Sequence, residues 1–155
     1  MLKKIQSSIV PLVVAVLFVI AGAAAIKSAA GSKLKPAGPS KVPFTTDSKA
    51  AFAQAKKEGK IVMVDFNADW CGPCQQMKRE FFTKQEVADA LTGVVAVDLN
   101  VDNPGDASDI ADRYPVEAYP TLLFLDSNGK EIGRLVGYGG VDDQLRRVKA
   151  IIARS

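Results

Sequence analysis

The sequence predicts an α/β domain in which helices cover a mixed β-sheet. Three observations support this prediction. Between residues 47 and 153, segments with a helical pattern alternate with short apolar runs rich in β-branched residues. Two of these runs, 121–125 and 131–136, flank a turn at 126–129 (Asp-Ser-Asn-Gly) and predict a β-hairpin. The length of 155 residues suits one domain of ordinary size with a short appendage.

The first half of the domain is expected to form a helix, a strand and two further helices. Residues 47–58 predict a short helix that Gly59 is placed to end. Residues 61–66 are an apolar run and predict a buried strand. A helix is expected to begin around Cys71. The capping-box sequence at residues 83–86 then predicts a break followed by a second helix.

The second half is expected to add a strand, a helix, the hairpin and a final helix. Residues 94–101 predict the strand, and residues 106–113 predict the helix that follows it. The last helix, 141–153, is expected to bury one apolar face that contains Leu145, Val148 and Ile152. A βαβ unit followed by a hairpin and a helix gives a mixed sheet covered by helices.

Charge is distributed unevenly along the chain. The net charge is +3, yet residues 1–46 hold six lysines and no acidic residue. Residues 47–155 carry 14 basic and 17 acidic side chains, which is a net charge of −3. A nucleic-acid-binding domain carries its positive charge on a folded face and not on a tail. We therefore expect no nucleic-acid partner.

The chain contains two cysteines and no histidine. The absence of histidine excludes Ser-His-Asp and Cys-His catalysis within one chain, and it removes the commonest metal ligand. Two thiolates from one chain cannot complete a four-ligand zinc site, which would require a dimer. We therefore expect no metal and no cofactor, and catalysis must use carboxylates, hydroxyls or the two cysteines.

Residues 5–26 form a segment of 22 residues without a charge. As a helix this segment would be about 33 Å long, enough to cross roughly 30 Å of bilayer hydrocarbon. Lys3 and Lys4 precede it and favour a cytoplasmic N-terminus, although four lysines also follow it. The sequence thus predicts one N-terminal transmembrane helix and a contact with the lipid bilayer.

Two other interpretations of this segment stay open. A cleaved secretory signal would have its apolar region at 12–20 and its cleavage site at 23–25 or 28–30. Alternatively, the anchor could leave the domain facing the cytoplasm. A retained single-pass anchor in a bacterial cytoplasmic membrane places the domain in the periplasm, and a cleaved signal leads to secretion. No cysteine follows the apolar run, so the segment does not fit a lipoprotein signal.

The predicted organisation is an anchor or signal segment at 1–26, a flexible linker at 27–43 and a domain at 44–155. The linker is rich in Lys, Ala, Gly, Ser and Pro. As a flexible coil, its ends would lie roughly 20–25 Å apart. With the anchor retained, the domain would therefore work close to a membrane surface. The basic linker either touches anionic headgroups or is simply a solvated tether.

The cysteines lie in the sequence Trp70-Cys71-Gly72-Pro73-Cys74, where the predicted strand ends and a helix begins. Free N–H groups and the dipole at a helix N-terminus stabilise a thiolate and lower the pKa of a thiol below about 8.5. We expect Cys71 to be the accessible nucleophile and Cys74, one turn later, to be the more buried resolving thiol. The two are within reach of a disulfide. Pro73 fits because the first helical turn needs no N–H from it.

Two alternatives for the cysteine pair are weaker. A purely structural disulfide would close only a very small loop and stabilise the protein little. Covalent haem attachment requires a histidine after the second cysteine, and the residue here is Gln75. The pattern therefore favours dithiol–disulfide exchange.

Several segments match one family. Residues 64–74 read VDFNADWCGPC and resemble the active-site strand and turn of thioredoxins. Residues 111–122, ADRYPVEAYPTL, resemble the thioredoxin segment that leads into its cis-proline, and Gly137 is a third match. Together these matches cover about residues 44–153 and imply the thioredoxin fold. Residues 77–91 are similar to the C-terminal thioredoxin-like domain of the bacterial transmembrane thiol:disulfide interchange protein.

The resemblance implies a substrate-binding surface around the cysteine pair, formed by Trp70, Gly72, Pro73, Tyr119, Pro120 and Gly137. Pro120 would be cis and would face the cysteines, which leaves the backbone of Tyr119 free to pair with an extended substrate. Gly137 would allow close approach of the substrate, although a glycine bulge explains it equally well. Trp70 would shield the cysteines, unless it is only a packing residue. An ordinary trans proline is the alternative at Pro120.

In thioredoxins the acid that corresponds to Asp65 lies beneath the second cysteine and moves its proton. Burial should raise the pKa of Asp65, which suits a general acid/base for Cys74, unless the carboxyl points to solvent at the strand end. Asp98 stands where many thioredoxins have a lysine. It either titrates as a pair with Asp65 or bonds a backbone group. Arg79 replaces a helix-kinking proline, and Asn67 replaces an aromatic residue.

The function that this resemblance implies is a protein-disulfide reductase acting on extracytoplasmic proteins, because Gly72 and Pro73 match the pair found in reducing thioredoxins. Such a domain cannot re-reduce itself outside the cytoplasm. A membrane electron donor is therefore implied, such as a transmembrane thiol:disulfide interchange protein. The alternatives are a disulfide oxidase or isomerase, which an oxidising compartment favours, and a non-enzymatic binding module regulated by its cysteines.

Overall fold

The structure is a computed structural model that describes residues 38–155. The predicted anchor or signal segment, 1–26, and most of the predicted linker lie outside the described residues. Within residues 38–155, no helix has both the length and the apolar character needed to span a bilayer.

The described elements follow the predicted order, with a two-residue strand added at the start. They are β1 (Phe44–Thr45), α2 (Ser48–Glu58), β2 (Ile61–Asn67), α3 (Gly72–Glu80), α4 (Gln85–Ala90), β3 (Val94–Asn100), the 3₁₀ helix η1 (Gly105–Ala107), α5 (Ser108–Arg113), β4 (Thr121–Leu125), β5 (Glu131–Val136) and α6 (Val141–Ile152).

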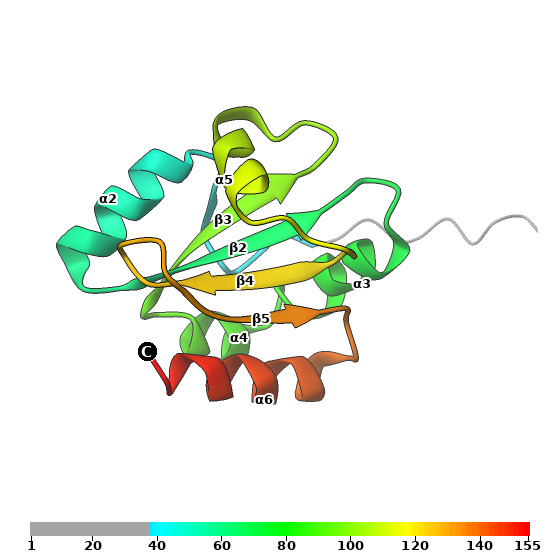
Figure 1. The fold of residues 1–155 in the computed structure, drawn as a ribbon. Coiled ribbons are helices and arrows are strands. Elements are labelled where there is room, and N and C mark those ends of the chain that lie inside the picture. Colours follow the sequence, from blue (N-terminus) through cyan, green and yellow to red (C-terminus); the bar gives the residue numbers. More distant parts are fainter. Residues whose placement is uncertain (1–37) are drawn as a thin grey trace, which may run out of the picture. The chain divides into compact units, whose positions relative to one another are not determined.

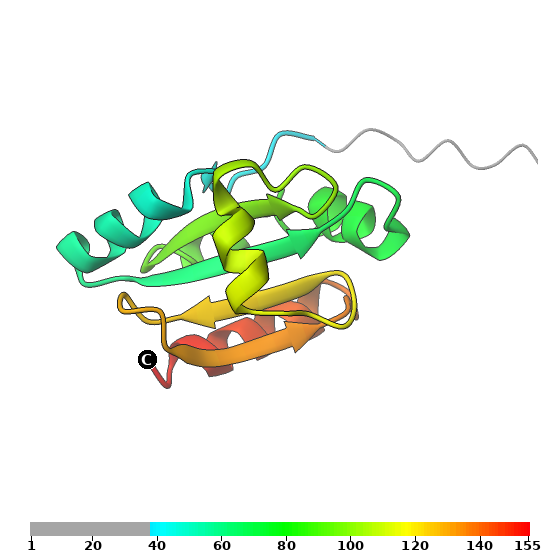
Figure 2. The same ribbon diagram turned by 45° about the horizontal axis from the view of Figure 1, so that its top comes forward.

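Within residues 38–155 the strands form one five-stranded mixed sheet with the order β1-β3-β2-β4-β5. Strands β1, β3 and β2 run parallel, whereas β4 is antiparallel to both β2 and β5. Helices α2 and α5 cover one face, and α3, α4 and α6 cover the other (Figures 1 and 2). The predicted mixed sheet flanked by helices is confirmed.

Strand β2 lies at the centre of the sheet and alternates between the two faces. Val62, Val64 and Phe66 belong to the core beneath α2 and α5, whereas Met63 belongs to the core beneath α3, α4 and α6. Side chains two residues apart share a face, so Asp65 and Asn67 follow Met63 toward α3. The alternation thus directs two polar side chains toward the helix that begins after the cysteines.

The observed helix ends confirm some of the predicted helix-capping residues and contradict others. Helix α2 starts at Asp47, whose side chain accepts from the N–H of Ala50 at 2.9 Å, and it ends at Gly59 with φ of 64°. Both ends agree with the prediction. The break at residues 81–84 is also observed, but the predicted capping box is wrong. The Thr83 hydroxyl instead donates to the carbonyl of Arg79 at 2.7 Å, and α4 begins without a side-chain cap.

The buried face of α6 differs by one residue from the prediction. Val148 is buried as expected, but Gln144 and Ile151 complete the face in place of Leu145 and Ile152, which are half-buried. Ile151 packs directly over Gly133 of β5, where a Cβ would come within 3.3 Å of its side chain. The absence of a side chain at Gly133 leaves the space that Ile151 occupies.

The end of the segment predicted as linker packs on the domain. The N–H of Lys41 donates to the carbonyl of Phe82 at 2.8 Å, and the Ser40 hydroxyl lies 3.3 Å from the same oxygen. Val42 is buried in the core. The chain therefore enters the packed domain beside the loop that follows α3.

Candidate active site

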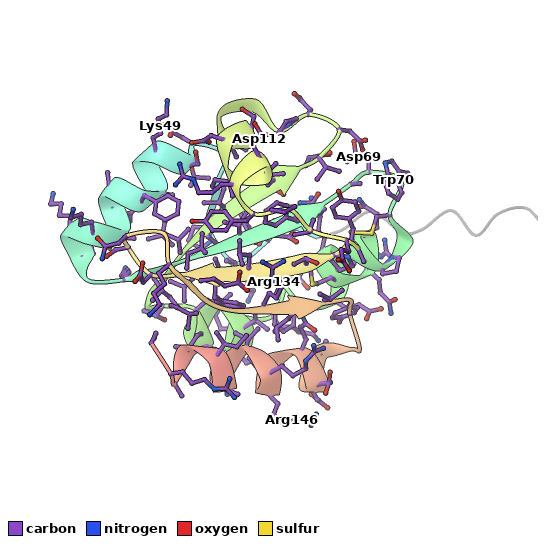
Figure 3. The ribbon with its side chains drawn as sticks, in the orientation of Figure 1. Lys49, Asp69, Trp70, Asp112, Arg134 and Arg146 are labelled. Carbon is purple, nitrogen blue, oxygen red and sulfur yellow. A yellow bond between two sulfur atoms is a disulfide. The ribbon has the colours of Figure 1, made fainter. Side chains whose placement is uncertain are left out.

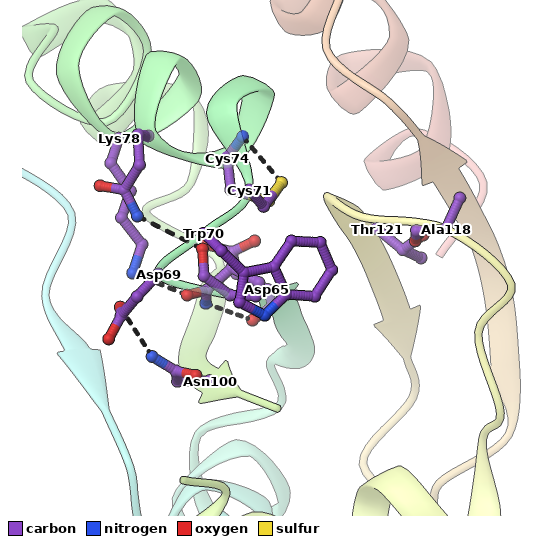
Figure 4. The surroundings of a disulfide bond; sticks show 12 residues. Asp65, Asp69, Trp70, Cys71, Cys74, Lys78, Asn100, Ala118 and Thr121 are labelled. Carbon is purple, nitrogen blue, oxygen red and sulfur yellow. Dashed lines mark hydrogen bonds between the residues drawn. A yellow bond between two sulfur atoms is a disulfide. The ribbon is translucent and has the colours of Figure 1, made fainter. Parts of the chain in front are cut away.

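Cys71 and Cys74 form a disulfide at the start of α3, with their Cα atoms 5.3 Å apart (Figure 4). Cys71 is the residue that caps the helix, and Pro73 occupies its first turn, where no N–H is required. The buried strand β2 and the short turn after it hold the start of α3 beyond the C-terminal end of the central strand. The predicted strand–turn–helix context of the motif and the reach of the two sulfurs are confirmed.

The two sulfurs differ in their surroundings. The Sγ atom of Cys71 accepts from the N–H of Cys74 at 3.2 Å, so a helix N–H points at this sulfur. Cys71 exposes 5% of its surface and Cys74 none, which is the predicted order. Ala68, Val101 and Tyr119 pack around the pair. An attacking or leaving sulfur of a substrate can therefore reach Cys71 and not Cys74.

The Tyr119–Pro120 peptide bond is cis, as the resemblance implies. The N–H of Gly137 donates to the carbonyl of Pro120 at 2.8 Å and links the loop before β4 to the end of β5. Gly137 has φ of 77°, a left-handed conformation that a residue with a side chain rarely adopts. Its backbone conformation thus gives a reason for glycine at this position besides access for a substrate.

Trp70 is 69% exposed, so the interpretation of this residue as a packing side chain is wrong. Its ring meets that of Tyr119 edge to face, with centroids 6.0 Å apart, and its Nε1 donates to Asp102 at 3.2 Å. Asp69 beside it is exposed and accepts from Asn100 at 2.9 Å. Figure 3 shows Asp69 and Trp70 together at the edge of the molecule. Trp70 is thereby held as an exposed apolar surface next to Cys71.

Asp65 lies inside the protein, which overturns the alternative of a solvent-facing carboxyl. It is 1% exposed, and neither of its carboxylate oxygens has a hydrogen-bond partner among the described residues. Burial, followed by the negative charge of Asp98, raises the pKa of Asp65 to about 7, while the charge of Lys78 acts in the opposite direction. A carboxyl that titrates near neutral pH can accept and return a proton under physiological conditions.

Asp98 is the direct neighbour of Asp65 on β3, as the predicted pairing requires. It has a partner that the sequence analysis missed, because Lys78 of α3 lies 3.5 Å from its carboxylate. Asn67 joins the two by donating to Asp98 and accepting from Lys78 at 2.9 Å. The signal was present in the spacing, since Lys78 follows Cys74 by one helical turn and so lies on the same helix face.

The described residues 38–155 contain no group of three or more His, Cys, Asp or Glu side chains placed to hold a metal ion. The chemistry that these residues can carry out is the exchange of two thiols for one disulfide, with a buried carboxyl to move a proton. This arrangement is the active site of a thiol–disulfide oxidoreductase.

Comparison with known proteins identifies the family. Residues 48–150 match the family model of the thioredoxin-like domain, and the chain belongs to that family. The fold is the thioredoxin fold, and the Cys71–Cys74 disulfide is its redox cysteine pair. The expectation from the sequence motifs is thus confirmed at the level of family and reaction class.

Individual relatives include both thioredoxins and an interchange protein. A thioredoxin H-type of Oryza sativa subsp. indica is 37% identical over 102 residues, which are 66% of this chain and 78% of that protein. The thiol:disulfide interchange protein DsbD of Cronobacter sakazakii is 41% identical over 92 residues, 57% of this chain but only 16% of that protein. The solution structure of a thioredoxin from Thermus thermophilus aligns with a TM-score of 0.61 and 28% identity, covering 71% of this chain and 86% of its own.

Proposed function

We propose that this protein reduces disulfide bonds in extracytoplasmic proteins. The observation that supports this most directly is the cysteine pair at the start of α3, with Gly72 and Pro73 between the cysteines. The Cys71 thiolate attacks one sulfur of a substrate disulfide, which forms a mixed disulfide and releases the other substrate sulfur as a thiolate. The Cys74 thiolate then attacks Sγ of Cys71, releases the second substrate thiolate and closes the disulfide.

Two electrons and two protons pass to the substrate in one cycle. Asp65 is the acceptor we assign to the proton of Cys74 before the second attack, and its burial on β2 with a pKa raised to about 7 supports this role. The solvent supplies protons to the released substrate thiolates. This division gives Cys71 the role of nucleophile, Cys74 that of resolving thiol and Asp65 that of general base.

The oxidised pair must be reduced again before another cycle. A membrane protein that carries two electrons as a dithiol is the donor we propose, and the similarity to DsbD supports an interchange protein of that type. Exchange with such a donor is the reverse of the substrate reaction, since its thiolate attacks the Cys71–Cys74 disulfide. The same exposed surface around Trp70 would then meet donor and substrate in turn.

Localisation at the membrane is part of the proposal. The uncharged segment at 5–26 supports an anchor, and the six lysines before residue 47 support a tether near anionic headgroups. Expression of the full chain in bacteria, followed by protease treatment of spheroplasts, tests this placement. A membrane-bound domain that is cleaved from outside supports the anchor. Protection from the protease contradicts an extracytoplasmic domain, and release of a shortened chain supports signal cleavage and secretion.

The activity is tested by insulin reduction with dithiothreitol as electron source. The full chain should accelerate insulin precipitation, and Cys71→Ser should reduce the rate to the uncatalysed background. Gln76→Ala, an exposed position on α3, is the matched control and should retain full activity. Absence of turnover by the wild-type chain favours the binding-module alternative, and full activity of Cys71→Ser contradicts the assigned nucleophile.

The direction of the reaction is tested by the reduction potential of the cysteine pair. Equilibration with a dithiothreitol buffer should give a value near the reducing end of the known range, about −270 mV. A value near about −120 mV contradicts the reductase and favours a disulfide oxidase or isomerase.

A further inference from the structure

Three polar side chains form a cluster beside Asp65 on the α3 side of the sheet. Asn67 lies two residues after Asp65 on β2, and Asp98 is the neighbour of Asp65 on β3. The side chain of Lys78 extends from α3 to Asn67 and Asp98. The Lys78 ammonium group lies 2.9 Å from Asn67 Oδ1 and 3.5 Å from Asp98 Oδ1. Figure 4 shows Lys78 on α3, the helix that carries the cysteines, and Asp65 below that helix.

Asn67 gives this cluster a fixed geometry. Its Nδ2 donates to Asp98 Oδ1 and also lies 3.0 Å from the carbonyl of Asp65 and 3.3 Å from that of Leu99. The side chain is fully buried, so these bonds are not exchanged for water. Asn67 therefore orients its Oδ1 toward Lys78 and holds the ammonium group at one place beside Asp98.

A small cavity of about 160 Å³ connects Asp65 with this cluster. Asp65, Lys78 and Asp98 all line it, and Ser40 and Phe82 contribute to its wall. The Lys78 and Asp98 side chains are 27% and 34% exposed, whereas Asp65 is buried. The cavity thus lies between a carboxyl inside the protein and two charges that meet solvent.

The charges around Asp65 come from two of the elements packed on it. Strand β3 contributes the negative charge of Asp98, and α3 contributes the positive charge of Lys78. Cys74 of α3 is held in the disulfide and carries no charge. Strand β4 places the apolar Leu122 opposite Asp65, and the lead-in segment adds the uncharged Ser40. Among the described residues Lys78 pairs with Asp98 and leaves the Asp65 oxygens unbonded.

We propose that Lys78 is a positioning residue for proton transfer: held by Asn67, it balances the charge of Asp98 and so sets the pH at which Asp65 exchanges a proton with Cys74. This inference rests on the proposed function, because it assigns a control over the general base of that reaction. Without Lys78 the charge of Asp98 is unbalanced and keeps the proton on Asp65 to higher pH. Without Asp98, Asp65 releases its proton at lower pH.

The test follows the Asp65 carboxyl carbon by ¹³C NMR over a pH series, in the oxidised full chain. Lys78→Met should raise the midpoint of the Asp65 titration by about 0.5–1 pH unit, and Asp98→Asn should lower it by a similar amount. The double variant should fall between the two single variants. Arg79→Met removes a neighbouring cation of α3 outside the cluster and should leave the midpoint unchanged.

An unchanged midpoint in folded Lys78→Met overturns the proposal, as does an equal shift in Arg79→Met. Lys78→Gln, which keeps a polar side chain, replaces Lys78→Met if that variant fails to fold, and the same rise is expected. The titration uses oxidised protein and needs neither substrate nor donor. Its outcome is therefore independent of insulin turnover, and failure of this inference is distinguishable from failure of the proposed reductase.

Discussion

The disulfide has two sides, and they are constructed differently. On the surface side, Trp70 and Pro73 are exposed, and the loop before Pro120 faces solvent next to Cys71. On the interior side, Asp65 is buried and its charged neighbours belong to separate elements of the fold. The surface side uses backbone and aromatic features that a substrate can contact. The interior side places a buried carboxyl beside two partly exposed charges, which separates recognition of a substrate from control of the proton.

The largest expected effect comes from the residue that lies between the two sides. Cys74→Ser should stop turnover, because the mixed disulfide formed by Cys71 can no longer be resolved. Insulin reduction should fall to background, and mass spectrometry should detect a covalent adduct between the chain and a substrate peptide. Cys71→Ser is the control and should give no adduct. Adducts of equal yield in both variants would contradict the two separate roles.

The interior side is tested by the pH dependence of stability. Because the pKa of Asp65 is raised to about 7 from an ordinary value of about 3.9, ionisation of Asp65 destabilises the folded state. This loss in the free energy of unfolding is absent below about pH 4, grows between about pH 4 and 7, and reaches its full size above that range. Asp65→Asn should therefore stabilise the oxidised chain more at pH 8 than at pH 4, with a difference of about 3–4 kcal/mol in the free energy of unfolding.

Urea unfolding of wild type and Asp65→Asn at both pH values measures this difference. Any effect of the amide group itself is the same at both values and cancels in the comparison. Asp69→Asn is the matched control, because it makes the same substitution at an exposed position on the surface side. If the gain in the free energy of unfolding differs between pH 8 and pH 4 by no more for Asp65→Asn than for Asp69→Asn, ionisation of Asp65 does not destabilise the folded state.

The surface side should respond more weakly. Trp70→Ala removes an exposed apolar ring next to Cys71 and should raise the KM for insulin by about three- to tenfold, with kcat largely retained. Asp102→Asn keeps the shape of the partner of the indole N–H but removes its charge, and should change KM by less than about twofold. Steady-state kinetics measures both. A fall in kcat with unchanged KM for Trp70→Ala would contradict a role in substrate binding and would indicate a role in the chemical step.

The same division explains how much of the site could be predicted. The cysteine motif, its helix start and the proline before β4 are local in sequence, so the surface side was largely predictable. The burial of Asp65 was expected from its place in an apolar strand, and its position opposite Asp98 followed from the resemblance to thioredoxins as one of two alternatives. Lys78 was missed: its spacing from Cys74 places it on the same face of α3, but which residue it reaches depends on the rotation of α3 over the sheet, which side-chain packing determines. The capping box at Thr83 failed because its hydroxyl bonds the preceding turn at the carbonyl of Arg79 instead of the helix that follows. The buried face of α6 was displaced by one residue because packing against the sheet, and not the pattern of α6 alone, decides which side chains are buried.

The attachment of the lead-in segment to Phe82 has a mechanical consequence. Phe82 follows the C-terminal end of α3, whereas the disulfide lies at its N-terminal end, about 13 Å away along a helix of nine residues. A force applied through the chain before residue 40 therefore acts on the loop after α3 and is not transmitted directly to the cysteines.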